Sequence, residues 1–245
     1  MKLQVKLMVL SVVLIWLAIW FLPDGKLHVV FCDVGQGDAT LITYKSFQIL
    51  VDAGPENSIS RCLAKYMPFY DKKIDVVILT HDNTDHSQGM EEVAKRYKVT
   101  YWQPKLRQGQ VLKMGDIRYA VEWPDSQVLG VNTISTENEL GIVGKVSYKE
   151  FDVLLTADVS TKNYAAEAGL EIFKVPHHGS KTGVTAEWLV DAGPKLAVIS
   201  VGRNSFGHPA KEAIELLSHQ GIEILRTDEQ GDIEIISDGT RFWVK

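Results

Sequence analysis

Apolar and polar residues are arranged along the chain so that one long apolar run precedes a series of short strands and helices. Residues 7–22 contain no charged side chain and one polar side chain, Ser11. A run that is apolar on every side is typical of a membrane segment, because a buried helix of a globular domain is apolar along one stripe. We therefore expect residues 1–26 to form an N-terminal membrane anchor, or an uncleaved signal, followed by a short linker.

The residues on either side of this run predict its orientation. Lys2 and Lys6 precede it, which favours a cytoplasmic N-terminus and an extracytoplasmic remainder. Pro23, Asp24 and Gly25 follow it and offer no small-x-small cleavage site. We expect a single-pass protein of the cell membrane, and a secreted protein is the alternative if the segment is cleaved.

From residue 27 onward, short β-branched and aromatic runs alternate with helical patterns. The pattern predicts strands at residues 27–34, 40–44, 47–54, 74–80, 98–102, 117–123, 140–148, 151–158, 170–176, 195–202, 222–226, 232–237 and 240–245. It predicts helices at residues 57–66, 89–97, 184–192 and 209–220. Because strands and helices are mixed throughout, we expect an α/β (α+β) fold with one domain at residues 27–245, built from two sheets covered by helices.

Composition limits the ways in which this domain can bind a partner. The formal net charge is -5 and the pI is about 5.8, which argues against a broad basic face that holds nucleic acid by charge alone. Any recognition of phosphate must therefore be local. The two cysteines, Cys32 and Cys62, are too few for a disulfide framework or a structural zinc site. A single bridge between them remains open if the domain lies outside the cytoplasm.

Residues 81–86 follow a predicted strand and are rich in metal-ligand side chains. His81, Asp85 and His86 offer imidazole and carboxylate groups, and Asn83 adds an amide oxygen. Imidazoles and carboxylates are the usual ligands of zinc, manganese and iron. The alternative is a polar turn in which Asp85 caps the helix at residues 89–97. We favour the metal-binding interpretation because similar residues follow other predicted strands.

Three predicted strands in the second half of the chain end in such residues. Asp158 ends the strand at residues 151–158, and His177 and His178 follow the strand at residues 170–176. His208 lies in the loop that follows the strand at residues 195–202. Loops at strand ends are where layered α/β proteins place ligands and substrates. The pattern therefore predicts one metal-binding centre assembled from several loops.

The motifs resemble those of a known family. The run HDNTDH resembles the HxHxDH motif of metallo-β-lactamase-fold hydrolases, and the segment VDAG resembles the strand and turn that precede it in that family. More narrowly, DVGQGDAT, LTHxxxDH, TAD, VPHHGSKT and SVGRNSFGHP resemble the catalytic domain of ComEC/Rec2-type competence proteins, in a stand-alone form. The likeness covers about residues 27–245. It implies a four-layer αββα metallo-β-lactamase sandwich, which would follow the one N-terminal membrane helix that the apolar run predicts.

The resemblance also implies a set of metal ligands. These are His81, Asn83, Asp85, His86, Asp158, His177 and His178. His81 would serve one metal position, Asp85 and His86 a second, and Asp158 would bridge the two. One or both of His177 and His178 would complete the centre, with His178 the first choice.

Further roles follow from the same resemblance. His208 and Lys181 would contact the substrate phosphate or protonate the leaving group. The chemistry of the site adds that Asp85 or Asp158 can orient the attacking water. Asp33 and Asp38 would lie behind the ligands or at the mouth of the site. Asp52, in the preceding strand and turn, would also lie behind the ligands.

The motif departs from the family pattern at Asn83, where the wider fold has His and the ComEC-like group commonly has Asp. An amide is a weaker ligand than either side chain. We therefore expect one or two divalent ions, zinc or manganese, with two hypotheses for the departure. Either the first metal position is weak, or Asp82 supplies the missing carboxylate through a shifted loop.

The expected function is a metal-dependent hydrolase that cleaves a phosphodiester with metal-activated water. The resemblance makes DNA, possibly single-stranded, the favoured substrate and suggests a DNA-uptake channel protein as a partner. The N-terminal apolar run predicts the membrane as a further partner. One alternative is a cell-surface phosphodiesterase that acts on a small phosphate ester such as phosphocholine. A second alternative is a non-catalytic tethered binding or scaffold protein, which Asn83 would favour.

Overall fold

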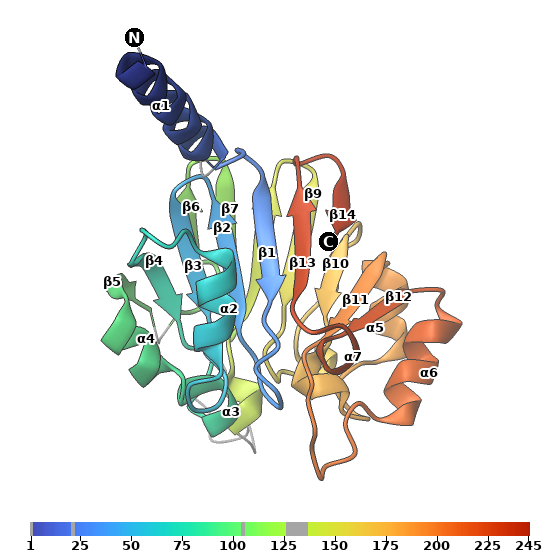
Figure 1. The fold of residues 1–245 in the computed structure, drawn as a ribbon. Helices are drawn as coiled ribbons and strands as arrows, with labels where there is room; N and C mark the ends of the chain where they lie inside the picture. Colours follow the sequence, from blue (N-terminus) through green and yellow to red (C-terminus); the bar gives the residue numbers. More distant parts are fainter. Residues whose placement is uncertain (1, 21–22, 104–105, 126–136) are drawn as a thin grey trace.

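The computed structural model describes residues 2–20, 23–103, 106–125 and 137–245. Helix α1 (Lys2–Trp20) projects away from the rest of the chain (Figure 1). It covers most of the predicted anchor, whose residues 1 and 21–22 lie outside the described ranges. Among the residues described, no helix has the length and apolar character that crossing a membrane requires, so the predicted membrane helix is not supported here.

The strands form two mixed sheets, each with seven strands in the described part of the chain. Sheet one has the order β14-β13-β1-β2-β3-β4-β5. Its strands are β1 (Leu27–Phe31), β2 (Thr40–Tyr44), β3 (Phe47–Val51), β4 (Lys73–Ile78), β5 (Lys98–Trp102), β13 (Ile233–Ser237) and β14 (Phe242–Val244). Strands β3, β4 and β5 are parallel, whereas β13, β1, β2 and β3 pair in antiparallel fashion.

Sheet two has the order β12-β11-β10-β9-β8-β7-β6. Its strands are β6 (Val111–Met114), β7 (Ile117–Trp123), β8 (Val143–Tyr148), β9 (Phe151–Leu155), β10 (Ile172–Lys174), β11 (Leu196–Ile199) and β12 (Glu223–Arg226). The run from β9 to β12 is parallel. The carboxyl ends of these four strands therefore lie on one edge of the sheet.

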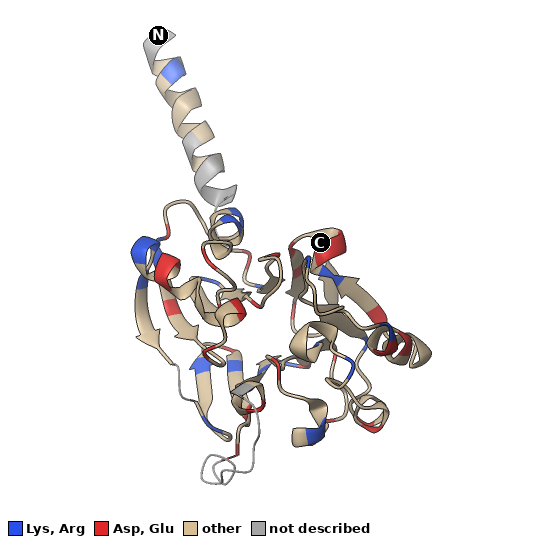
Figure 2. Cartoon of the chain, turned by 90° about the horizontal axis from the view of Figure 1, so that it is seen from below, with Lys and Arg blue, Asp and Glu red and all other residues tan. Residues whose placement is uncertain are grey.

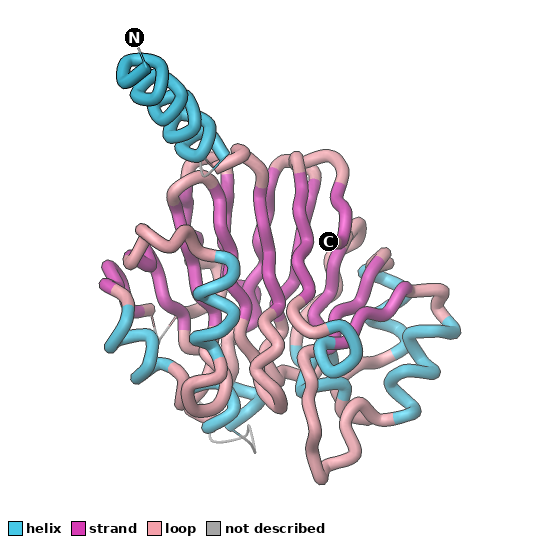
Figure 3. The backbone as a smooth tube through the Cα atoms, viewed as in Figure 1, coloured by secondary structure: helices cyan, strands magenta, loops and turns pink. Residues whose placement is uncertain are grey.

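Helices cover the outer face of each sheet (Figure 3). The helices are α2 (Ile59–Tyr66), α3 (Thr84–Ser87), α4 (Met90–Arg96), α5 (Ala186–Ala192), α6 (Lys211–His219) and α7 (Thr227–Gln230). Short 3-10 turns are η2 (Glu137–Leu140), η3 (Thr161–Asn163) and η4 (Pro176–Gly179).

Three apolar cores separate four layers. The largest core lies between the sheets and includes Phe31 and Tyr119. A second core joins sheet one to α2 and α4, and a third joins sheet two to α5 and α6. Strand β1 shows why its sequence is continuously apolar: Val29 packs in the central core while Val30 packs under the helices of sheet one. The predicted α/β sandwich of two sheets flanked by helices is confirmed.

Cys32 and Cys62 form a disulfide that joins the end of β1 to α2. Their Cα atoms are 5.7 Å apart, within the range that a disulfide allows, and both side chains are fully buried. The structure thus contains the single bridge that the sequence left open.

Candidate metal centre

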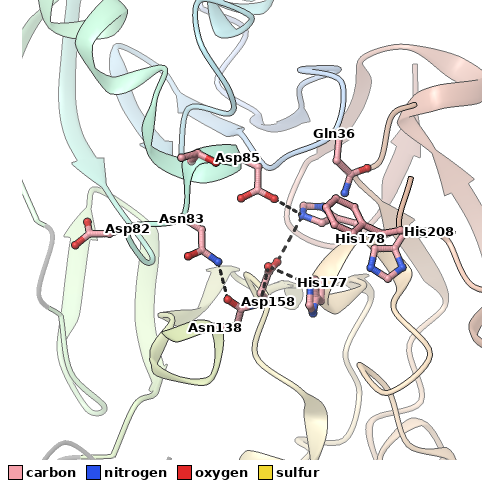
Figure 4. Close-up of a pocket in the computed structure, with 11 residues that line it drawn as sticks. Gln36, Asp82, Asn83, Asp85, Asn138, Asp158, His177, His178 and His208 are labelled. Carbon is pink, nitrogen blue, oxygen red and sulfur yellow. Dashed lines mark hydrogen bonds and ion pairs between the residues drawn. The ribbon is translucent and has the colours of Figure 1, made fainter. Parts of the chain in front are cut away.

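Four side chains from both sheets converge at one edge of the sandwich. Asp85 and His86 lie in α3, which follows β4 of sheet one. Asp158 follows β9, and His178 lies in η4, which follows β10, both in sheet two. One ligand atom from each of the four lies within 4.8 Å of the others. Figure 4 shows Asp85 and Asp158 both directed toward His178.

Hydrogen bonds orient two of the imidazole rings. His86 Nδ1 lies 2.8 Å from a carboxylate oxygen of Asp52, and His178 Nδ1 lies 2.9 Å from the carbonyl oxygen of Ser200. These oxygens can only accept, so each Nδ1 carries the hydrogen. The ring of His86 therefore directs Nε2 toward the centre, and the ring of His178 does the same. This arrangement is typical of metal-ligating histidines.

Asp52 also fixes a third histidine, through Thr80. The Asp52 carboxylate accepts hydrogen bonds from the Thr80 amide at 2.8 Å and from the Thr80 hydroxyl at 2.7 Å. Because that hydroxyl donates to Asp52, it accepts from His81 Nδ1, which lies 3.0 Å away. His81 Nε2 is then left facing Asp158. Asp52 thus contacts His86 directly and His81 through Thr80.

Three buried atoms at the centre have no hydrogen-bond partner within the described residues: His81 Nε2, His86 Nε2 and Asp158 Oδ1. The nitrogen of His86 lies 3.3 Å from Asp158 Oδ1, and that of His81 lies 3.8 Å from Asp158 Oδ2. Buried polar atoms are nearly always paired, so three that converge require an explanation. Two imidazole nitrogens and a carboxylate oxygen fit a divalent cation of the zinc or manganese class.

The charges at the centre shift the pKa values of its members. Burial alone would lower the pKa of His86, but the carboxylates of Asp52 and Asp158 raise it well above the usual 6.5. Burial alone would raise the pKa of Asp158, but the charge of His86 lowers it well below its usual range. Burial and neighbouring His86 lower the pKa of His81. The metal-free centre therefore holds a proton on His86 that a cation would have to displace.

A pocket of about 370 Å³ opens onto the centre. Its lining is mainly polar and comes from loops of both sheets. The residues that line it are Gln36, Asp82, Asn83, Thr84, Asp85, Asn138, Asp158, His177, His178, Phe206 and His208.

Asn83 reaches this pocket, but its amide nitrogen is bound to another side chain. Asn83 Nδ2 donates to Asn138 Oδ1 at 2.6 Å, and Asn138 Nδ2 donates to Asp158 Oδ2 at 3.5 Å. An amide chain thus stands beside Asp158 where the family motif would place a stronger ligand. Asp82 lines the pocket but points away from this cluster (Figure 4), which gives no support to the shifted-loop hypothesis.

His177 and His208 lie together at the side of the pocket. The ring of His177 is 39% exposed, its Nε2 is 3.8 Å from Asp158 Oδ2, and its centroid is 5.4 Å from that of His208. Burial and the charges of His177 and His178 lower the pKa of His208. A ring with a lowered pKa is neutral at neutral pH, which suits it to contact a phosphate as a neutral donor.

Two residues that the resemblance placed near substrate make other contacts. Lys181 Nζ lies 2.7 Å from Glu212 and is absent from the described lining of the pocket. Asp33 pairs with Arg61 at 2.9 Å and accepts a hydrogen bond from the Gly35 amide. Asp33 therefore shapes the loop that follows β1 rather than facing the centre. Both proposed roles for Lys181 remain predictions.

Lys174 is a buried residue of this site that the sequence analysis missed. Its ammonium group pairs with Asp38 and donates to the Ala157 carbonyl at 2.7 Å, with the side chain 3% exposed. Asp38 Oδ1 in turn lies 3.6 Å from His178 Nδ1. The pair places a fixed positive charge behind the ligands. The sequence signal that could have identified Lys174 is the presence of a lysine inside the apolar segment of residues 170–176.

Asp38, Asp52 and His86 form a second ligand-type group. Asp52 accepts from His86 Nδ1 and Asp38 Oδ2 pairs with Lys174, whereas Asp38 Oδ1 has no hydrogen-bond partner among the described residues. This group therefore supports the centre and does not form a separate cation site. Asp38 lies between Lys174 and His178, and its role behind the ligands stays a prediction.

The backbone at the centre adopts rare conformations. Asp52, Ala157, His177 and His178 have φ values of 57°, 48°, 49° and 53°. Left-handed conformations cost non-glycine residues about 1–3 kcal/mol each and concentrate at functional sites. Gly37 also belongs to this edge: a Cβ atom there would lie 2.3 Å from the Asp85 carbonyl oxygen. The loop after β1 can therefore pack directly on α3.

The two sheets and the helices that flank them have the arrangement of the metallo-β-lactamase fold, whose known members are generally metal-dependent hydrolases. Residues 32–109 match the family model described as the metallo-beta-lactamase superfamily.

The chain is similar to competence proteins, which confirms the resemblance in its motifs. It is 24% identical to ComE operon protein 3 of Bacillus subtilis (strain 168), over 86% of this chain and 33% of that protein. It is 28% identical to Recombination protein 2 of Haemophilus influenzae, over 83% of this chain and 28% of that protein. The chain thus spans about a third of the length of these relatives.

Solved structures confirm the fold. The metallo-beta-lactamase fold protein YhfI from Bacillus subtilis superposes with a TM-score of 0.55 and 16% identity, covering 86% of this chain and 100% of that one. A diphosphatase from the PhnP family gives a TM-score of 0.53 and 12% identity, covering 86% of this chain and 98% of that one. At these identities the likeness concerns the fold alone.

Proposed function

We propose that this domain is a divalent-metal-dependent phosphodiesterase that cleaves DNA. The observation that carries the proposal is the convergence of His81 Nε2, His86 Nε2 and Asp158 Oδ1, which are buried and lack hydrogen-bond partners among the described residues, beside a pocket that Asp158 lines. Asp85 and His178 complete the donor set. A divalent cation bound there would supply an activated water and positive charge beside the phosphoryl oxygens under attack.

The chain's own residues have distinct roles in this proposal. Burial alone would raise the pKa of Asp85, but its hydrogen bond with His178 and the nearby positive charges lower it below the usual 3.8. Asp85 is therefore ionised at neutral pH, and its side chain is 31% exposed toward the pocket, so it can orient water and accept a proton. His208, on the opposite side of His178, would contact the phosphate.

Two observations support DNA as the substrate. The relatives are named as competence and recombination proteins, and their similarity to this chain covers most of the domain. A divalent cation bound at the centre would also supply the local positive charge that an acidic chain requires if it binds phosphate. Figure 2 shows basic and acidic residues interspersed over both halves of the domain.

The experiment uses the full chain with single-stranded DNA and with bis(p-nitrophenyl) phosphate, in manganese, in zinc and in a chelator. We expect metal-dependent cleavage of both substrates and a loss of about 10²–10⁴-fold in kcat for Asp85→Ala. His219→Gln, at the exposed end of α6, should retain full activity. Cleavage of the small ester without DNA cleavage would favour the small-ester enzyme. Metal binding without turnover of either substrate would favour the alternative of a non-catalytic binding or scaffold protein.

We also propose that the domain acts outside the cytoplasm at the cell membrane, where a DNA-uptake channel protein would be its partner. The buried Cys32–Cys62 disulfide supports this location, because such bonds persist in oxidising compartments. Helix α1 adds exposed apolar side chains, including Leu7, Met8 and Trp16. Recovery of the full chain in the membrane fraction, with the domain open to protease added outside the cell, is the expected result. Recovery in the cytoplasm would contradict it.

A further inference from the structure

An exposed aromatic ring stands at the mouth of the pocket. Phe206 is 75% exposed, yet it lines the pocket together with His177 and His208. Its ring stacks on that of His208, with an interplanar angle of 26° and 6.1 Å between centroids. A largely exposed phenylalanine contributes little to the core, so its place beside the proposed phosphate site calls for another explanation.

The loop that carries Phe206 is held in one conformation by Asn204. The Asn204 amide nitrogen donates to the carbonyls of Gly202 and His208, both at 2.8 Å. Its amide oxygen accepts from the backbone of Phe206 at 3.0 Å and of His208 at 3.1 Å. The Asn204 side chain thus fixes the backbone of this turn by four hydrogen bonds, and the position of the Phe206 ring is fixed with it.

We propose that Phe206 is the stacking platform for a nucleobase of a single-stranded polynucleotide whose phosphate enters the pocket. The proposal rests on the phosphodiesterase function proposed above and adds to it the kind of polymer. A base stacked on an aromatic ring gains affinity without regard to sequence, and an unpaired base has a free face to offer. Such a contact suits a domain of net charge -5, which cannot hold a strand by a broad basic surface.

The order of the aromatic rings along the loop gives each ring a different role in the proposal. Phe206 lies outward of His208, and His208 lies against His177, whose Nε2 is 3.8 Å from Asp158. The rings thus lead from the mouth of the pocket to the metal centre. A base held by the outer ring would place its own phosphate, or the neighbouring one, within the pocket.

The test compares the wild-type full chain with Phe206→Ala, Phe206→Trp and Phe206→Leu. The substrates are a single-stranded oligonucleotide and an oligonucleotide of the same length that carries abasic sites throughout. For Phe206→Ala we expect KM on the normal strand to rise roughly 5- to 150-fold, the range that stacking of one base gives, with kcat nearly unchanged. KM on the abasic strand should not change. Phe206→Trp should retain the wild-type KM, and Phe206→Leu should not.

Phe47→Ala is the matched control, because Phe47 is also exposed (41%) but lies at the opposite end of β3 from the site. An equal rise in KM on the normal and the abasic strands would overturn the inference, as would an unchanged KM in an active Phe206→Ala variant. A greater loss on p-nitrophenylphosphorylcholine than on DNA would assign the ring to a quaternary ammonium group instead. Wild-type protein that cleaves no nucleic acid would refute the proposed function itself.

Discussion

Asp52→Asn gives the sharpest test of the proposed centre, because Asp52 orients two ligands without facing the pocket. Its carboxylate is 1% exposed and accepts three hydrogen bonds, from His86 Nδ1 and from the amide and hydroxyl of Thr80. An asparagine amide has a single acceptor atom and would present an N–H group to one of these partners. If that group faces His86, the ring must carry its hydrogen on Nε2, and the nitrogen that faces Asp158 loses its lone pair.

The size of the effect follows from this loss of orientation. Removing a partner that orients a metal-ligating histidine costs about 10- to 100-fold in metal affinity. That range corresponds to about 1.4–2.7 kcal/mol of binding free energy. The substitution should also weaken the hydrogen bonds through which Thr80 orients His81. We therefore expect a loss of metal affinity in the upper half of this range.

The assay is competition between the full chain and a chelator of known affinity, for zinc and for manganese. It is best done at pH 8, because protons then compete less for the ligands. Asp75→Asn is the matched control: Asp75 is also buried in sheet one, where it accepts from the Gln48 amide and pairs with Lys73, away from the centre. Metal affinity within twofold of wild type in Asp52→Asn, with affinity abolished in Asp158→Ala, would refute the role of Asp52.

Three further results are expected. Removing the disulfide with Cys32→Ala and Cys62→Ala should lower the free energy of unfolding by about 3.5 kcal/mol, from the chain entropy of a separation of 30 residues, and urea denaturation measures this. Burial alone would lower the pKa of His28, but hydrogen bonds to Glu234 and Asp24 raise it above 6.5. The resulting stability is fully present below pH 6.5 and is lost as the pH rises through the folded-state pKa, so His28→Gln should destabilise the chain at pH 5.5 and not at pH 9. Asn83→Asp should raise the number of metal ions bound per chain, measured by elemental analysis, and an unchanged number would contradict the idea that Asn83 weakens one position.

The arrangement of strands and helices was largely predictable because the apolar pattern records which faces are buried. The order of the strands was not, since it depends on distant pairs such as β1 with β13, whose residues Leu27 and Ser237 are partners. Strand β6 was missed; it has four residues, of which only Met114 is buried, so it lies largely outside the core that the apolar pattern records.

The site was predictable where ligand-type side chains follow apolar strands, as with His86, Asp158 and His178. Residues that act through another side chain left weaker signals. Lys174 was hidden inside a strand whose other members are apolar, and its partner Asp38 lies 136 positions away. Phe206 carried no periodic signal at all, because its exposure depends on a loop braced by Asn204.

The charges at the centre explain why a buried lysine and protonated histidines occur together there. Four carboxylates, those of Asp38, Asp52, Asp85 and Asp158, meet in a small volume of the described structure. Lys174 supplies one fixed positive charge to this group.

When protonated, His86 and His178 offset two of the three negative charges that remain. Burial alone would lower the pKa of each ring, but the carboxylates around them raise both values. A divalent cation would bring two positive charges and displace these protons, so the total charge at the centre would change little. Metal binding should therefore release protons, and apparent affinity should rise with pH until both rings are neutral in the free chain. Removing Asp52 lowers the pKa of His86 and should flatten that dependence, which separates its electrostatic effect from its effect on ring orientation.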